Sequence, residues 1–201
     1  MSDREIADLL RTDEEAAFRL LYRRYAGQLR AVAYRYTGDS DKAEDVLQEA
    51  MIKVCRHADS FSYRGDGSLY GWIKRIVVHT ALNSLKSFHE ARMCPMDDLT
   101  EVATPETEED SEEEVSLLDR ISPEILLRMI GELPEGYRQV FSLYAVEGHS
   151  HKEIGAMLGI GERSSASQYC RAKKRLKEKL ELWIQETERE RAPLPGRGRL
   201  L

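Results

Sequence analysis

The sequence predicts an all-α protein that consists of two small helical domains joined by a flexible acidic linker. In residues 1–90 and again in residues 122–185, apolar side chains recur at steps of three and four positions, the period of a helix with one buried face. Between these segments the periodicity fades, and residues 97–120 hold eleven acidic side chains and one basic side chain. Such a segment repels itself and is too poor in apolar residues to form a core. We therefore expect a first domain at 1–90, a linker at 91–121, a second domain at 122–185 and a tail at 186–201.

The first domain is expected to contain a helix that Asp13 caps and Gly38 ends. Its buried face should consist of Phe18, Leu21, Tyr22, Tyr25, Leu29, Val32, Ala33 and Tyr36. A second helix should start near Asp41 and bury Ala43, Val46, Leu47, Ala50, Met51 and Val54. The other side of this helix groups acids and an amide, for which a solvated surface is the default interpretation: Glu44, Asp45, Gln48 and Glu49.

A loop dense in glycine and aromatic residues follows at 61–71, before a third helix at about 69–86. That helix should bury Trp72, Ile73, Ile76 and Val77 and present a polar stripe of Arg75, His79, Asn83 and Lys86. In the loop, aromatic rings lie next to a cation and to glycines that let the backbone approach a ligand: Phe61, Tyr63, Arg64, Gly65, Gly67 and Tyr70. Aromatic rings beside basic residues suit unstacked bases, at about 1–3 kcal/mol per stacked base. The alternative is a loop whose aromatic rings fold back beneath it and extend the core.

The second domain has clear helix boundaries. Ser122 should cap a helix with Pro123 in its first turn that runs to about Glu132, and a further helix should run from Glu135 to Val146 before Gly148. Ser150 and Glu153 form a capping box at the start of a short helix that buries Ile154, Met157 and Leu158. Gly159 ends this helix and Gly161 allows an immediate restart. In the long helix that follows, the buried stripe should be Ser165, Tyr169, Ala172, Leu176 and Leu180.

The long helix is strongly basic. Between Arg163 and Lys179 it carries seven basic residues and one acid, Glu178. A short capped helix, a glycine turn and a basic helix together predict a helix-turn-helix whose second helix enters the major groove of DNA. The alternative is a helical hairpin whose lysines only keep the protein soluble.

Composition excludes several classes of protein. The net charge of −6 reflects the acidic segment, because residues 97–120 contribute −10 and leave +4 for the rest of the chain. No apolar run approaches the ~18 residues of a membrane span, and the first ten residues, MSDREIADLL, do not resemble a signal peptide. These observations indicate a protein without membrane insertion.

Metal and catalytic chemistry have little support. The three cysteines, Cys55, Cys94 and Cys170, are far apart, which argues against disulfides and zinc and fits a reducing cytoplasm. The histidines lack metal-ligand spacing, and His149 and His151 are expected to be exposed turn residues. Motifs of hydrolases, nucleotide-binding proteins and metalloproteases are absent from the sequence. We expect no cofactor, no metal and no enzymatic activity.

Residues 43–87, with AEDVLQEAMIKVCRHADSFSYRGDGSLYGWIKRIVVHTALNSLKS, resemble region 2 of the extracytoplasmic-function sigma factors. Residues 133–180, which contain the helix-turn-helix, resemble their region 4. Both motifs occur in the family's order, joined by a variable linker without region 3, and with the helices that pack on them they cover nearly all of the chain. The resemblance implies a two-domain subunit of RNA polymerase that selects promoters and catalyses nothing itself.

The resemblance also implies roles for individual residues. Docking on the β′ clamp helices of core polymerase would fall to Asp45, Gln48 and Glu49, and the acidic linker would pass near the active centre. A flipped base of the −10 element would be captured by Phe61, Tyr63, Arg64, Tyr70, Arg75, His79 and Asn83. The −35 duplex would be contacted by Arg163, Ser164, Ala166, Ser167, Gln168, Cys170, Arg171 and Lys174. The further partners implied are the β flap of polymerase and, in some cases, an anti-sigma factor.

The chain departs from the family at two points. His79 stands where asparagine is usual, and it adds a group that can change charge near neutral pH. Arg163-Ser164 replaces the usual Gly-Thr, and Ala166 replaces a cation, so Arg163 would have to supply the lost phosphate or base contact. These differences concern which −35 sequence is read.

Two other functions remain open at this point. A helix-turn-helix DNA-binding transcriptional regulator would bind duplex DNA tightly without polymerase and use residues 1–90 to bind a ligand or to dimerise. A helical interaction protein would not bind DNA at all. Tight binding of the free chain to duplex DNA would favour the regulator, because free sigma factors commonly bind promoters weakly. A sigma factor should instead bind core polymerase and direct initiation in a purified transcription reaction.

Overall fold

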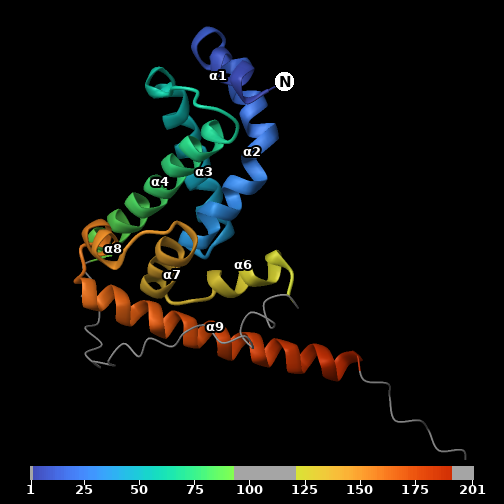
Figure 1. The fold of residues 1–201 in the computed structure, drawn as a ribbon, viewed down its shortest axis with the longest axis vertical. Coiled ribbons are helices and arrows are strands. Elements are labelled where there is room, and N and C mark those ends of the chain that lie inside the picture. Colours follow the sequence, from blue (N-terminus) through green and yellow to red (C-terminus); the bar gives the residue numbers. More distant parts are fainter. Residues whose placement is uncertain (1, 93–120, 192–201) are drawn as a thin grey trace, which may run out of the picture.

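The computed structural model of the chain describes residues 2–92 and 121–191, and all regular secondary structure in those ranges is helical (Figure 1). The all-α prediction is therefore confirmed. Most of the expected acidic linker and the end of the expected tail lie outside the described residues, so the flexibility of the linker remains a prediction. Within 2–92 and 121–191, every helix is too short or too polar to cross a lipid bilayer.

The N-terminal half contains α1 (Asp3–Thr12), α2 (Glu14–Thr37), α3 (Ser40–Arg56), the short 3-10 turn η1 (Ala58–Ser60) and α4 (Ser68–Arg92). The predicted boundaries of α2 are confirmed. Asp13 accepts a hydrogen bond from the Ala16 amide at 3.0 Å, and Gly38 ends the helix in the left-handed region with φ of 66°. The first helix has its own capping box, in which Ser2 and Glu5 exchange hydrogen bonds.

The core of this half lies between α2, α3 and α4. All six apolar residues predicted for α3 are buried. The prediction for Tyr22 is wrong, because this residue is 38% exposed and donates its hydroxyl to Glu44 at 3.0 Å across the α2–α3 seam. Phe18, Trp72 and Ile76 lie at the margin of the core and are half-buried.

The C-terminal half contains α6 (Pro123–Gly131), α7 (Glu135–Phe141), the π-helical turn η2 (Ser142–Val146), α8 (His151–Leu158) and α9 (Glu162–Arg191). Ser122 caps α6 as predicted. The helix expected from Glu135 to Val146 is α-helical only as far as Phe141. Beyond it, the Glu147 amide donates to the Ser142 carbonyl at 3.1 Å, the five-residue step of a π turn. The long helix α9 continues through Leu182 and Trp183 to Arg191.

The two halves also pack directly against each other, an interface that the sequence did not predict. Figure 1 shows α7 and α8 between the lower ends of α2 and α4 and the rod of α9. Three buried residues of the C-terminal half, Val140, Leu143 and Ile154, belong to the same apolar core as α2, α3 and α4. At this junction Gly131 lies so close to Tyr34 that a methyl group would overlap the tyrosine ring.

Arg138 forms four hydrogen bonds, two of which join the halves. Its guanidinium donates to the carbonyls of Tyr36 and Thr37 at the end of α2, each at 2.9 Å. It also donates to the carbonyls of Gly131 and Leu133 at the end of α6, again at 2.9 Å. Burial lowers the pKa of this arginine, which is 7% exposed, but the guanidinium stays charged. The last carbonyl groups of a helix have no hydrogen-bond donor within it, and here a single cation supplies donors at the ends of both α2 and α6.

Candidate nucleic-acid interface

The aromatic loop between η1 and α4 is anchored by Phe61. This residue is 5% exposed, its ring lies 5.0 Å from the ring of Trp72, and its carbonyl accepts a 2.8 Å hydrogen bond from Arg11. The expectation that Phe61 offers a face to a base is therefore wrong for this structure. The residue instead supports the loop from beneath, the alternative weighed for these aromatic residues.

The rest of the loop is closer to the surface. Tyr63 is half-buried and donates its hydroxyl to Asp66 at 2.9 Å, which raises the pKa of Tyr63. Arg64 is exposed at the tip, and its amide donates to the Ser68 hydroxyl at 3.2 Å. Gly65 and Gly67 both take positive φ and so permit this tight turn.

Tyr70, at the start of α4, is half-buried, with its ring 5.4 Å from that of Tyr25. The loop thus presents one cation, Arg64, and the partly exposed rings of Tyr63 and Tyr70.

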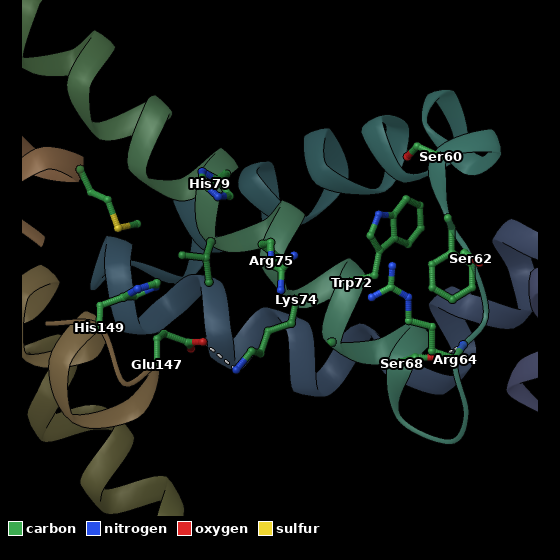
Figure 2. Close-up of a pocket in the computed structure, with 14 residues that line it drawn as sticks. Ser60, Ser62, Arg64, Ser68, Trp72, Lys74, Arg75, His79, Glu147 and His149 are labelled. Atoms are coloured by element: carbon green, nitrogen blue, oxygen red, sulfur yellow. Dashed lines mark hydrogen bonds and ion pairs between the residues drawn. The ribbon is translucent and has the colours of Figure 1, made fainter. Parts of the chain in front are cut away.

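The polar stripe predicted on α4 is confirmed as an exposed surface. Arg75, His79 and Asn83 follow one another at four-residue steps and are all exposed. The first two line the same cleft of about 700 Å³ as the loop residues Phe61 and Arg64 (Figure 2). The loop and the stripe, which are separate in the sequence, therefore share one concave surface.

The C-terminal half completes this cleft with Glu147, His149 and Met157. Figure 2 shows Lys74 reaching from α4 to Glu147, where Nζ lies 2.6 Å from the carboxylate. Arg35 of α2 lies 3.4 Å from the same carboxyl group. The pairing of Glu147 with Lys74 and Arg35 was not predictable, because nothing in the local sequence indicates an ion pair across the two halves.

The outer face of α3 carries Asp45, Gln48 and Glu49, and all three are exposed as predicted. Glu49 is paired with Lys53 at 2.6 Å, one turn along the helix. Glu44 differs from the other acids, because it is half-buried under the Tyr22 hydroxyl. One turn beyond Glu49, Ile52 is 50% exposed and adds an apolar side chain to this surface.

The helix-turn-helix is formed by α8 and α9. Ser150 and Glu153 make the predicted capping box, with the Ser150 amide donating to the Glu153 carboxylate at 2.8 Å. Gly159 ends α8 with φ of 72°. Close packing of the turn requires Gly155, because a Cβ there would lie 2.8 Å from the Ile160 carbonyl oxygen. The two helices are thus held close together by a tight turn.

His149 and His151 are half-buried, so the prediction of exposed turn residues is wrong for both. The His151 ring stacks on Tyr144 with centroids 4.3 Å apart, and its Nδ1 lies 3.0 Å from the Ser165 hydroxyl. Burial lowers the pKa of His151. This histidine therefore connects the start of α8 to the buried side of α9.

The predicted DNA-facing residues of α9 differ in exposure. Arg163, Ser164 and Lys174 are exposed, whereas Ala166, Ser167, Cys170 and Arg171 are half-buried. The prediction that Gln168 faces outward is wrong. Its amide oxygen is buried and would lie 2.8 Å from a Cβ at Gly136 of α7, so this side of the residue faces the domain interior. Tyr169, predicted as buried, is half-buried beside Phe141 and Tyr144.

Within the described ranges, no three acidic, histidine or cysteine side chains lie close enough together to hold a metal ion. The surfaces that remain are a cationic cleft with aromatic residues, an acidic helix face and a basic helix-turn-helix. The first and third have the charge and shape of nucleic-acid interfaces.

Comparison with known proteins identifies relatives across nearly the whole chain. Residues 21–89 match the family described as Sigma-70 region 2, and residues 124–176 match Sigma-70, region 4. The ECF RNA polymerase sigma-E factor of Escherichia coli K12 is 31% identical over 187 residues, which cover 90% of this chain and 95% of the relative. The RNA polymerase sigma-H factor of Pseudomonas aeruginosa is 30% identical over 194 residues, which cover 92% and 96%. A solved structure of the sigma factor RpoE from Bartonella quintana, in complex with the anti-sigma factor NepR, covers 82% of this chain and 96% of that one, with a TM-score of 0.46 and 20% identity.

Proposed function

The chain belongs to the extracytoplasmic-function sigma factors of the sigma-70 family, and we propose that its two helical halves divide promoter recognition between an opened strand and a closed duplex. As a sigma factor it associates with core RNA polymerase and directs transcription initiation from specific promoters. In this proposal region 2 is the domain at 1–90, region 4 is the domain at 122–185, residues 91–121 link them and residues 186–201 are a tail.

Capture of the −10 element falls to the part of the cleft that region 2 lines. The observation that supports it best is the shared surface of the loop and the α4 stripe, where Arg64, Arg75 and His79 line one cleft. Tyr63 and Tyr70 supply partly exposed rings, and Asn83 extends the stripe by one turn. The cations bind phosphates and the rings stack on bases, so stacking offsets the cost of unpairing. Phe61 acts by holding the loop in shape.

Recognition of the −35 element falls to the start of α9. Arg163 and Ser164 stand exposed at its first turn, followed by Ala166, Ser167, Cys170, Arg171 and Lys174. A helix of this kind reads base edges with its N-terminal residues and contacts phosphates with its basic ones. Gln168 supports the packing of α9 on α7 and has at most its amide nitrogen to offer.

Polymerase binding falls to the acidic face of α3. Asp45, Gln48 and Glu49 suit a basic partner surface, for which the family's β′ clamp helices are the candidate. The β flap and an anti-sigma factor complete the set of expected partners. Members of this family are recognition subunits rather than catalysts, and we assign the chain no enzymatic role and a cytoplasmic location.

A run-off transcription assay tests the proposal. Core polymerase with the full chain should initiate on a subset of genomic DNA fragments, and core polymerase alone should not. Arg171→Ala should weaken promoter engagement by about 1–3 kcal/mol, whereas Arg189→Ala, exposed near the distal end of α9, should have no effect. Tight binding of the free chain to duplex DNA, with no stimulation of polymerase, would instead identify a stand-alone regulator.

A further inference from the structure

Glu147 is the acid that region 4 contributes to the cleft between the two domains. Its side chain is 10% exposed and forms ion pairs with Lys74 at 2.6 Å and with Arg35 at 3.4 Å. The backbone around it is fixed. Gly148, with φ of 77°, donates its amide to the Tyr144 carbonyl at 3.2 Å, and the His149 amide donates to the Leu143 carbonyl at 3.0 Å. The carboxylate is thus held in place by its own turn as well as by its two partners.

The other ionisable groups that line the cleft are basic or histidine: Arg64, Lys74, Arg75, His79 and His149. A carboxylate held between an ammonium and a guanidinium has the arrangement that these cations adopt around a phosphate oxygen. Lys74 lines the same cleft as Arg75, which we assign to the captured strand. A phosphate of that strand would therefore pass close to the position that Glu147 occupies.

Building on the proposed function, we propose that Lys74 and Arg35 form a phosphate-binding site for the captured promoter strand, and that Glu147 covers this site while the two domains are docked. In this arrangement Glu147 takes the place of a DNA phosphate. The strand and region 4 compete for the same two cations, so binding of one disfavours binding of the other.

The interface around the site is imperfect, which allows this competition. Among the described residues, the buried Nε of Arg35 and the buried hydroxyl of Tyr36 have no hydrogen-bond partner. Burying such atoms without partners destabilises the docked form. The two hydrogen bonds from Arg138 to the carbonyls of Tyr36 and Thr37 act in the opposite direction and hold the domains together. The docked form is therefore stable but open to displacement by a polyanion.

The test measures binding of the free, full-length chain to a fluorescent single-stranded oligonucleotide that carries the −10 sequence of a promoter found by the run-off assay. Glu147→Gln removes the negative charge that pairs with both cations and should raise the affinity about threefold to tenfold. The plot of log affinity against log salt should steepen by about 0.7 for each additional phosphate that the variant neutralises. Lys74→Gln added to Glu147→Gln should remove most of the increase in affinity. The same oligonucleotide as a duplex should show a smaller increase, because the site serves an opened strand.

Glu132→Gln is the matched control, because it removes one negative charge from region 4 at a pair with Lys179 that lies outside the cleft. This variant should bind as the wild type does. Equal increases in affinity for Glu132→Gln and Glu147→Gln would show a general charge effect and overturn the proposal. An unchanged affinity in Glu147→Gln, or an increase that survives Lys74→Gln, would overturn it as well. If wild-type chain still initiates with core polymerase in either case, only the covered site is refuted and the proposed function stands.

Discussion

The Nε atom of Arg138 donates a 2.9 Å hydrogen bond to the carbonyl oxygen of Tyr36, so a side chain of region 4 completes the end of a helix in region 2. The guanidinium forms three further bonds of the same length to Thr37, Gly131 and Leu133. The interface between the domains therefore depends on one buried cation as well as on apolar contacts.

Arg138→Ala should destabilise the chain by about 3 kcal/mol, because it removes four charge-assisted hydrogen bonds and leaves buried carbonyls without donors. Arg138→Lys should cost less, since it retains the charge but cannot span four acceptors. Urea denaturation followed by circular dichroism measures both. A cost for Arg138→Ala below about 1 kcal/mol would mean that the four bonds contribute little to stability.

Gly131→Ala should separate the domains without unfolding either one. The added methyl group overlaps the ring of Tyr34 in the docked form, while alanine favours helix α6 by about 1 kcal/mol. Small-angle X-ray scattering should show a larger radius of gyration. The control is Gly27→Ala on α2, where a Cβ meets nothing within 4 Å. If Gly131→Ala scatters like the wild type, Tyr34 has moved aside and the contact does not limit docking.

Tyr36→Phe should leave stability unchanged or raise it by up to about 1 kcal/mol, because the buried hydroxyl has no partner among the described residues. Tyr25→Phe is the contrasting variant. The Tyr25 hydroxyl donates to Asp3 at 2.5 Å, and burial helps to raise the pKa of Tyr25 to about 12. Its loss should cost about 1–2 kcal/mol. Thermal unfolding compares the two, and an equal loss in both would show that Tyr36 does have a hydrogen-bond partner.

Protonation of His151 should weaken the helix-turn-helix. Burial lowers the pKa of His151 below its usual 6.5, so the unfolded chain binds a proton at a pH where the folded chain does not. The stability contributed by the neutral ring is complete above about pH 6.5 and decreases as the pH falls toward the lowered folded-state value. His151→Phe keeps a ring to stack on Tyr144 and should abolish this part of the pH dependence. The check is the urea midpoint of both proteins across this range, and parallel curves would contradict the assignment.

Ser150→Ala should destabilise region 4 by about 1 kcal/mol, because the capping box at the start of α8 is lost. Ser2→Ala removes the equivalent box of α1, at the far end of region 2. Both variants should unfold more readily, but only Ser150→Ala should also reduce transcription from promoters that depend on the −35 element. A comparable transcription defect in Ser2→Ala would mean that the loss follows stability rather than the position of α9.

Helix boundaries were predictable because their causes are local. Asp13, Gly38, Ser150 and Gly159 act within one turn of the chain, and each does what its residue type predicts. The six buried residues of α3 were also predictable, since a single helical period selects them. Local chemistry was therefore sufficient for most of the fold.

Contacts between distant residues were not predictable. Phe61 is buried because Arg11 and Trp72 hold it, and neither belongs to the loop itself. Gln168 turns inward because Gly136 leaves space for its amide. The partners of Arg138 and Glu147 in region 2 lie far upstream in the sequence, so no local pattern reveals them. The errors in the predicted site are therefore errors of long-range packing.

Helix α9 is one unbroken helix of thirty residues, so its first turns and its distal end move together as one rigid body. Leu182, which is 59% exposed, stands about 28 Å along the axis from Arg163, at 1.5 Å per residue. A small tilt of α9 about its DNA-facing start would displace the Leu182 side chain by several ångströms. A fluorophore at Leu182 would therefore follow promoter engagement without touching DNA.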